Sequence, residues 1–276
     1  MTGVAGIVLA GGRSTRMGSP KAGLEWHGST LLRRTAGILA RFGPVVVVRA
    51  AGQDLPPLPG GLRVIDDPRA GLGPLQGIAA GLAAVRAELA FVCSTDLPFL
   101  HPAFVGRVLG AAAASGADVA LPLARGFRQP LAAAYRPALA PLADRLVAAG
   151  RLRPAFLLGA CSVECLDEAA LLADPVLAAL DPGLDSLVNV NDPAGYAAAR
   201  ERMPPLVTVG RLGAPGSGAA ARTVVRAATV GGAAAAVGAG LDGAVAVMLN
   251  GRDVAADGQL PLAAGDTVVL IEAAGR

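Results

Sequence analysis

The stretch Gly6-Ile7-Val8-Leu9-Ala10-Gly11-Gly12-Arg13-Ser14-Thr15-Arg16-Met17-Gly18-Ser19-Pro20-Lys21 joins an apolar strand to a basic, glycine-rich loop. Lys21 is the only lysine among 24 basic side chains. Its ammonium is a compact point charge, whereas arginine presents a broad planar fork. Gly11 and Gly12 let backbone N–H groups approach an anion without an intervening Cβ. The stretch therefore predicts a phosphate-binding loop, although it has neither the P-loop spacing nor the dinucleotide fingerprint.

Composition limits the classes of function. Apolar residues make up 53% of the 276 residues and aromatic residues 3%, and the net charge of +3 is carried by residues 1–202. A small phosphorylated ligand fits this charge better than a nucleic-acid face, which would show a broader basic stripe and stacking aromatics. Three cysteines and two histidines lack zinc spacing. We expect a cytoplasmic protein without a membrane segment, since the N-terminus is apolar first and basic afterwards, unlike a signal peptide.

From residue 4 to about 200 the chain alternates apolar β-branched runs with helical periods. The expected strands cover residues 4–9, 45–48, 62–65, 89–93 and 119–121, and the expected helices cover 31–42, 75–86, 102–115 and 137–149. Near-continuous apolar strands separated by helices indicate an α/β fold with a mostly parallel, Rossmann-like sheet covered by helices on both faces. Ligands bind such sheets beyond the carboxyl ends of the strands.

The pattern changes at Met203-Pro204-Pro205, which predicts a domain boundary between residues 1–202 and 203–276. Beyond it we expect strands at 206–212, 223–230, 244–249 and 267–273, a helix at 232–239 and a turn at Asn250-Gly251. Two hairpins around one helix are typical of a small α+β roll of the β-grasp type.

Polar side chains follow several of the predicted strands. They are Asp66 and Asp67, then Asp96, and later Asn189 and Asn191. A carboxylate beside a basic loop suits Mg²⁺, which one or two carboxylates and substrate phosphates usually hold. Asp96 read alone also fits a helix cap or turn, and the other two pairs equally fit turn residues.

Together these residues resemble molybdenum cofactor guanylyltransferases over residues 4–202. The resemblance is carried by Leu9-Ala10-Gly11-Gly12-x3-Arg16-Met17-Gly18-x2-Lys21, Asp67, Gly73-Pro74-Leu75-x-Gly77, Asp96-x-Pro98, Gln129-Pro130 and Val188-Asn189-Val190-Asn191. It implies an enzyme that transfers GMP from GTP to molybdopterin with Mg²⁺ and releases pyrophosphate.

The resemblance also implies roles for individual residues. The nucleotide would be bound by Leu9, Ala10, Gly11, Gly12, Asp67, Pro74 and Leu75, its phosphates by Lys21 and Arg16, the metal by Asp96 and the pterin by Asn189 and Asn191. The chain departs from the family pattern at Pro20, where an acidic residue is frequent, and at Arg49, where an asparagine is expected.

The alternatives are a cytidylyltransferase of the same fold that uses CTP, and a non-catalytic nucleotide-binding or carrier-interaction protein. Residues 203–276 resemble ubiquitin-like sulfur carriers, best at Leu249-Asn250-Gly251-Arg252 and at 262–271. The chain ends Ala274-Gly275-Arg276 without the terminal Gly-Gly of those carriers. We therefore expect a module that contacts other molybdenum cofactor biosynthesis proteins, or else an unrelated appendage, and we expect its deletion to spare transfer in vitro.

Overall fold

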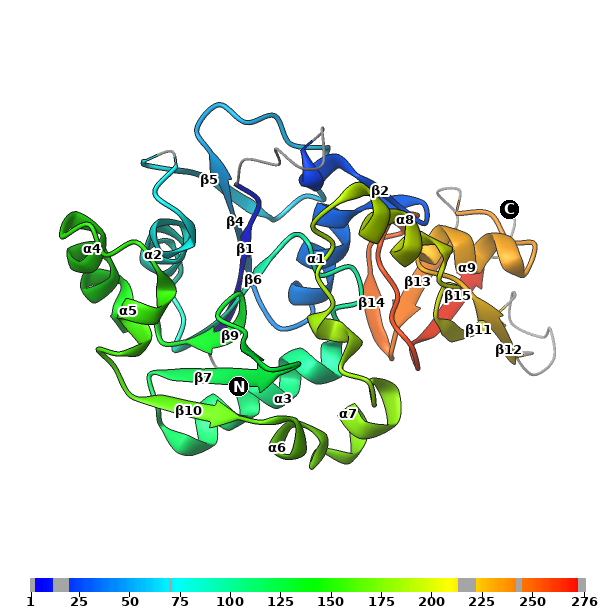
Figure 1. The fold of residues 1–276 in the computed structure, drawn as a ribbon. Coiled ribbons are helices and arrows are strands. Elements are labelled where there is room, and N and C mark those ends of the chain that lie inside the picture. Colours follow the sequence, from blue (N-terminus) through cyan, green and yellow to red (C-terminus); the bar gives the residue numbers. More distant parts are fainter. Residues whose placement is uncertain (1–2, 12–19, 70, 213–221, 242–244, 273–276) are drawn as a thin grey trace.

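The structure, a computed structural model, describes residues 3–11, 20–69, 71–212, 222–241 and 245–272. Within these residues a large sheet and a smaller sheet lie on opposite sides of helix α1 (Leu31–Leu39) (Figure 1). The large sheet belongs to the first two thirds of the chain and the smaller one to the last third. Helix α1 is therefore in a position to link the two.

The large sheet has eight strands in the described residues, in the order β10-β7-β9-β6-β1-β4-β5, with β8 paired to β7. The strands are β1 (Val4–Leu9), β4 (Val45–Ala50), β5 (Arg63–Asp67), β6 (Leu89–Ser94), β7 (Val119–Ala124), β8 (Phe127–Arg128), β9 (Ala132–Tyr135) and β10 (Val163–Leu166). Strand β1 pairs in parallel with β4 and β6, so that Val8 lies opposite Val47 and Cys93. The prediction of a mostly parallel sheet is confirmed.

Strand β9 is the exception, because it runs antiparallel to both β6 and β7. The connection from β7 to β9 is too short for the crossover that a parallel pair requires. The strand itself reads Ala132-Ala133-Ala134-Tyr135, without a β-branched residue. For this reason the sequence pattern did not predict it.

Helices cover both faces of the large sheet (Figure 1). One face carries α2 (Pro74–Ala84), α4 (Ala140–Ala148) and α5 (Pro154–Leu158), and the other carries α1, α3 (Pro102–Ser115), α6 (Glu168–Leu172) and α7 (Pro175–Leu180). Alternate residues of β1 serve the two cores: Ile7 packs with the α2 side and Val8 with the α1 side. Both are fully buried, and each such side chain stabilises the fold by about 1.5–3 kcal/mol.

A short hairpin leads from Lys21 into α1. It consists of β2 (Glu25–Trp26) and β3 (Ser29–Thr30), and Thr30 caps α1 by accepting a hydrogen bond of 3.2 Å from the N–H of Arg33. Short 3₁₀ turns lie at Lys21–Gly23, Pro137–Leu139 and Asp185–Leu187.

The smaller sheet follows α8 (Pro193–Glu201) and has the order β12-β11-β15-β13-β14. Its elements are β11 (Leu206–Leu212), β12 (Arg222–Arg226), α9 (Val230–Ala236), β13 (Val245–Leu249), β14 (Arg252–Val254) and β15 (Thr267–Glu272). Asn250 and Gly251 both have positive φ, as the predicted tight turn requires. A mixed sheet with one helix is thus present, whereas the likeness to sulfur carriers and the division at residue 202 stay predictions.

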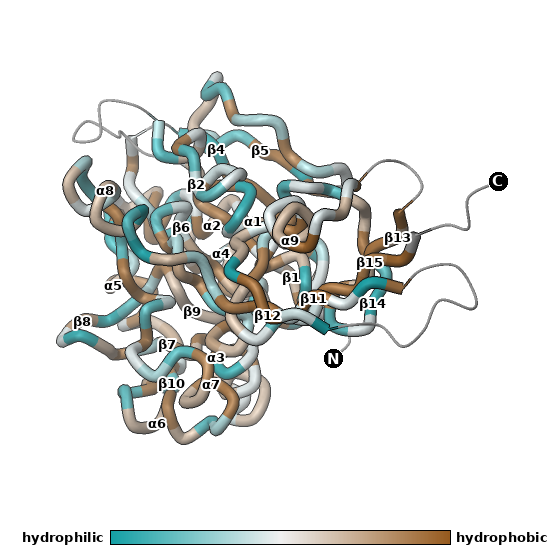
Figure 2. The backbone as a smooth tube through the Cα atoms, turned by 90° about the vertical axis from the view of Figure 1, so that its right-hand side faces the viewer, coloured by the Kyte–Doolittle hydropathy of each residue, from teal (hydrophilic) through white to brown (hydrophobic). Residues whose placement is uncertain are grey.

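Hydropathy follows this architecture. Figure 2 shows brown segments at β13 and β15 of the smaller sheet, and teal at β8 on the edge of the molecule. In the described part of the chain, every helix is too short or too polar to cross a bilayer.

Candidate active site

The glycine loop begins at the carboxyl end of β1, beside the neighbouring strand β4. The N–H groups of Ala10 and Gly11 both donate to the carbonyl of Val48, at 2.8 and 3.2 Å. A Cβ on Gly11 would lie 3.0 Å from the backbone nitrogen of Ala50, tighter than side chains normally pack. Glycine is thus required here by the close approach of two backbones. Two predicted residues of the loop, Gly12 and Arg16, lie outside the described residues.

Gln53 holds this loop in place, a role that the sequence pattern did not reveal. Its Nε2 donates to the carbonyl of Ala10 at 3.1 Å, while its Oε1 accepts from the N–H of Ala50 at 3.1 Å. Arg49 binds the backbone carbonyl of Gln53 at 3.0 Å and the carboxylate of Asp66 at 2.7 Å. Arg49, which stands where the family pattern has asparagine, therefore stabilises the loop after β4.

Lys21 meets two predicted site residues from distant parts of the chain. Its Nζ lies 3.3 Å from Oδ2 of Asp96 and donates to Oδ1 of Asn191 at 2.8 Å. Asp96 follows β6 and Asn191 precedes α8, and the N–H of Val190 donates to the carbonyl of Asp96 at 2.9 Å. The Lys21 and Asp96 side chains are 19% and 16% exposed, so that water screens their attraction only in part.

The second oxygen of Asp96 accepts a hydrogen bond from the hydroxyl of Ser94. This bond fixes the carboxylate at the edge of the sheet. Within the described residues no three His, Cys, Asp or Glu side chains gather as a complete metal site. A single carboxylate beside a phosphate-binding loop nevertheless fits Mg²⁺, because that ion takes most of its remaining ligands from phosphate and water.

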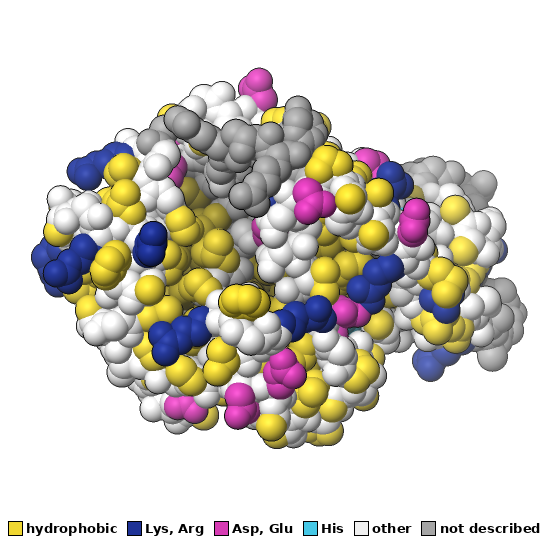
Figure 3. Space-filling model, viewed as in Figure 1, with side chains coloured by type: hydrophobic (Ala, Val, Ile, Leu, Met, Phe, Trp, Pro, Cys, Tyr) yellow, Lys and Arg dark blue, Asp and Glu magenta, His cyan; other side chains and the backbone are white. Residues whose placement is uncertain are grey.

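A cavity of about 820 Å³ opens over the carboxyl ends of β1 and β4 and reaches Ser94, which binds Asp96. Its size falls within the range of nucleotide-sized ligand sites. In Figure 3 it is the hollow with a largely hydrophobic floor between α2 and β1. The lining consists of Leu9, Gly11, Val48, Ala50, Asp67, Gly71, Gly73, Pro74, Gly77, Ser94 and Leu131.

Helix α2 forms one wall of the cavity. It begins after Gly73, whose φ of +80° suits glycine, and Pro74 occupies its first turn, where a missing N–H costs no helical bond. A Cβ on Gly77 would meet Leu9 Cδ2 at 3.3 Å, so the helix packs closely on β1. Leu75 is fully buried in the core, and its position could touch a ligand only through the backbone.

Asn189 and Asn191 are both exposed but differ in their partners. The amide of Asn189 donates to the carbonyl of Leu187 at 3.4 Å. Asn191 instead belongs to the group formed by Lys21 and Asp96.

Asp67 is the carboxylate that faces the cavity. Partial burial raises its pKa, and a 3.1 Å hydrogen bond from the N–H of Arg69 partly offsets this. A raised carboxyl pKa means that the fold favours the protonated form. The ionised carboxylate of Asp67 therefore lowers the free energy of unfolding. This loss of stability is absent below the unfolded-state pKa and is fully present above the folded-state pKa.

Replacing Asp67 with asparagine is therefore expected to raise the melting temperature slightly at neutral pH and to weaken nucleotide binding by roughly tenfold. In the unchanged protein, nucleotide affinity should fall as the pH drops through the raised pKa, and the variant should lose that pH dependence. Calorimetric titrations between pH 4.5 and 7.5, with melting curves at each pH, check this. Unaltered affinity in the variant would remove Asp67 from the nucleotide site.

The chain is similar to several known proteins. Residues 6–160 match the family model of the MobA-like NTP transferase domain. A Mycobacterium tuberculosis protein named "Probable molybdenum cofactor guanylyltransferase" is 42% identical over 163 residues, covering 57% of this chain and 80% of that protein. A protein of the same name from Mycobacterium avium is 40% identical over 179 residues, covering 62% of this chain and 89% of that protein.

Among solved structures, molybdopterin-guanine dinucleotide biosynthesis protein A from Archaeoglobus fulgidus aligns with a TM-score of 0.59 at 22% identity, over 71% of this chain and 97% of that one. The 2-C-methyl-D-erythritol 4-phosphate cytidylyltransferase from Thermus thermophilus aligns with a TM-score of 0.51 at 22% identity, over 72% and 98%. Both similarities concern the fold. The family match and the named relatives identify the chain as a nucleotidyltransferase. Within that class, the chain belongs to the MobA-like NTP transferase family.

Proposed function

We propose that this enzyme transfers GMP from GTP to molybdopterin, or to its molybdenum-loaded form, and releases pyrophosphate. The observation that carries the proposal is the 42% identity to relatives named as molybdenum cofactor guanylyltransferases, of which the chain covers 80%. The cavity of about 820 Å³ supports it, because it offers room for a nucleoside, and its lining residue Ser94 binds Asp96, the partner of Lys21.

In the proposed reaction, an oxygen of the terminal phosphate of the pterin attacks the α-phosphorus of GTP. The bond from that phosphorus to the bridging oxygen breaks on the opposite side, and pyrophosphate leaves with the electron pair. A phosphate nucleophile is already ionised at neutral pH, so no general base is required. Lys21 would neutralise charge on the phosphates, and positioning with charge neutralisation is the main requirement of phosphoryl chemistry.

Mg²⁺ is part of the proposal, with Asp96 as its protein ligand. When bound, the ion would neutralise phosphate charge at the reacting centre. Ser94 would then hold the carboxylate of Asp96 in place through the hydroxyl bond, and Asn191 would keep Lys21 close by.

The proposal also includes the division of the chain into two units that the sequence predicts. Residues 1–202 would form the transferase unit, and residues 203–276 a second unit that contacts other molybdenum cofactor biosynthesis proteins. The family match ends at residue 160, so it leaves the smaller sheet of residues 206–272 unassigned. We also propose that the enzyme acts in the cytoplasm.

Calorimetric titration with GTP, CTP and ATP in the presence of Mg²⁺ tests the proposal. We expect GTP to bind at least about tenfold more tightly than CTP or ATP, equivalent to 1.4 kcal/mol. Incubation with GTP and molybdopterin should then yield the dinucleotide and pyrophosphate in equal amounts. A preference for CTP would instead indicate a cytidylyltransferase, and failure to bind any of the three, with or without the pterin, would refute nucleotide transfer.

A further inference from the structure

Arg34 connects the turn that carries Asp96 to the smaller sheet. It lies on α1 and is only 5% exposed. Its Nε donates to the carbonyl of Pro98, two residues after Asp96, and its Nη1 donates to the carbonyl of Leu262 at 3.0 Å. One buried side chain thus joins the candidate catalytic turn to a loop 228 residues away in the sequence.

The electrostatics of Arg34 are unusual for a purely structural side chain. Burial lowers its pKa to about 10, and the neighbouring charge of Arg41 acts in the same direction, whereas the nearby carboxylate of Asp266 raises the pKa in part. Both of its hydrogen bonds are accepted by carbonyl oxygens, while the carboxylate of Asp266 is bound by Arg41 through two contacts of 2.9 Å. Burying a cation against neutral acceptors is unfavourable compared with an apolar side chain of similar volume. The side chain holds the carbonyls of Pro98 and Leu262 at a fixed position relative to each other.

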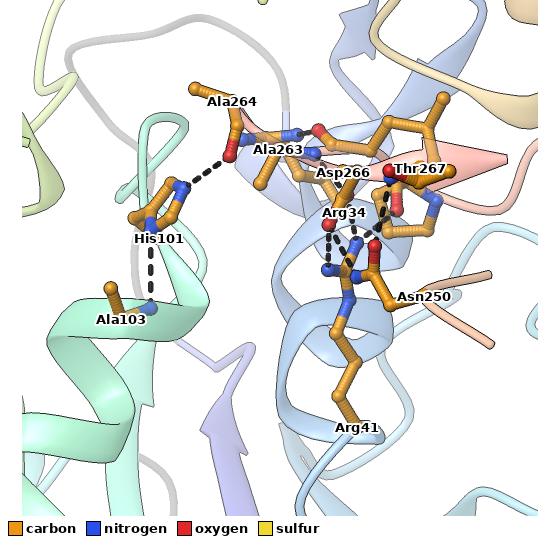
Figure 4. A network of polar contacts seen from close by, with 11 residues as sticks. Arg34, Arg41, His101, Ala103, Asn250, Ala263, Ala264, Asp266 and Thr267 are labelled. Atoms are coloured by element: carbon orange, nitrogen blue, oxygen red, sulfur yellow. Dashed lines mark hydrogen bonds and ion pairs between the residues drawn. The ribbon is translucent and has the colours of Figure 1, made fainter. Parts of the chain in front are cut away.

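His101 makes a second connection at the end of the same turn (Figure 4). Its Nδ1 accepts from the N–H of Ala103 at 3.0 Å and caps α3. The Nε2 therefore carries the proton and donates to the carbonyl of Ala264 at 3.0 Å. Burial lowers the pKa of His101, which keeps the ring neutral and this arrangement fixed. The turn of residues 96–101 is thus attached to the smaller sheet at two points.

The receiving loop, residues 257–266, is itself held firmly. A Cβ on Gly37 of α1 would lie 2.5 Å from Pro261 Cγ, so the loop packs against the helix backbone. Asp266 accepts from the Asn250 amide at 2.8 Å and from the Ala263 N–H at 2.7 Å, besides its pair with Arg41. Figure 4 shows these bonds converging on Asp266 next to Arg34. The loop can therefore serve as a rigid anchor.

We propose that Arg34 is a positioning residue for nucleotidyl transfer, which holds the Asp96 turn through Pro98 and uses the loop of residues 257–266 as its anchor. This inference rests on the proposed function and makes the smaller sheet part of the catalytic framework. It replaces the expectation that residues 204–276 are dispensable for transfer in vitro. Arg34 is distant from the reacting atoms in this scheme and acts through Asp96.

The test compares Arg34→Met with Arg33→Met. Arg33 lies next to Arg34 on α1 and also binds the smaller sheet's loop, through Asp257, but among the described residues it forms no hydrogen bond or ion pair with the Asp96 turn. We expect Arg34→Met to lower kcat by about 10- to 100-fold while the dissociation constant for GTP without metal stays within twofold, because misplaced catalytic groups affect turnover first. The Mg²⁺ concentration for half-maximal rate should rise. Arg33→Met should leave all three quantities near their original values.

His101→Asn supplies a second variant in case Arg34→Met fails to fold. Asparagine can still cap α3 but cannot reach Ala264, so kcat should again fall with unchanged GTP affinity. Amide hydrogen exchange of residues 94–101 should become faster in both variants and stay unchanged in Arg33→Met. Unchanged kcat and exchange in the two variants would overturn the proposal, and so would equal losses in Arg33→Met. If the unchanged enzyme transfers no nucleotide, the proposed function fails, while the exchange rates still decide whether Arg34 holds the turn.

Discussion

Replacing Asp96 with alanine is expected to abolish nucleotidyl transfer, lowering the rate by about 10³-fold or more. Its carboxylate is the acid that pairs with Lys21, and it lies at the end of β6 beside the cavity. In the variant the proposed metal would lose its protein ligand. The charge on the phosphates of GTP would then be incompletely neutralised, although Lys21 remains. Initial rates of dinucleotide formation at saturating GTP and pterin, over a range of Mg²⁺ concentrations, measure the loss.

A matched pair of substitutions separates charge from structure. Asp96→Asn keeps the size of the side chain and can still accept from Ser94, so the fold should persist while activity is lost. Asp192→Asn changes a neighbouring carboxylate that caps α8 by accepting from the Gly195 N–H at 2.7 Å. Asparagine caps helices equally well, so this control should keep near-normal activity. Mg²⁺-dependent turnover in either Asp96 variant would show that the metal is bound elsewhere.

The central part of the fold could be predicted from the sequence because its strands are apolar and β-branched. The prediction for β1 at residues 4–9 and that for α3 at residues 102–115 agree with the structure at both ends. Two four-residue strands escaped prediction: β9, which has no β-branched residue, and β10, in which Val163 is the only one. Their place in the sheet depends on pairing with neighbours, which a local pattern does not contain.

The sequence indicated candidate site residues one at a time but not their arrangement. The glycine loop and Asp96 stood out because each follows an apolar strand, whereas the contact between Lys21 and Asn191 joins positions 170 residues apart. Arg33 and Arg34 illustrate the limit most clearly. They are adjacent arginines in one helical pattern, yet Arg34 binds Pro98 in the Asp96 turn and Leu262, whereas Arg33 binds Pro57 and Asp257. Which partners each of the two arginines binds is decided by tertiary packing.

Exchanging Lys21 for arginine keeps the positive charge and is expected to lower kcat/KM by roughly 100-fold, equivalent to about 2.7 kcal/mol. The lysine Nζ fits between Asn191 Oδ1 at 2.8 Å and Asp96 Oδ2 at 3.3 Å. A planar guanidinium would bind the carboxylate of Asp96 with two N–H groups. This contact would move the carboxylate away from Ser94 and from the phosphates. Steady-state kinetics with GTP as the varied substrate, together with GTP binding in the absence of pterin, measure the effect.

The reverse exchange at a surface pair provides the control. Arg200 binds Glu25 at 2.7 Å, but the two side chains are 42% and 48% exposed, and such pairs contribute little to stability. Arg200→Lys should therefore leave kcat/KM unchanged within twofold, which shows that an Arg–Lys exchange in this protein is tolerated where only a solvated charge is needed. Near-normal activity of Lys21→Arg would mean that charge alone suffices at this position. The shape of the lysine side chain could then no longer explain why the chain keeps its one lysine beside Asp96.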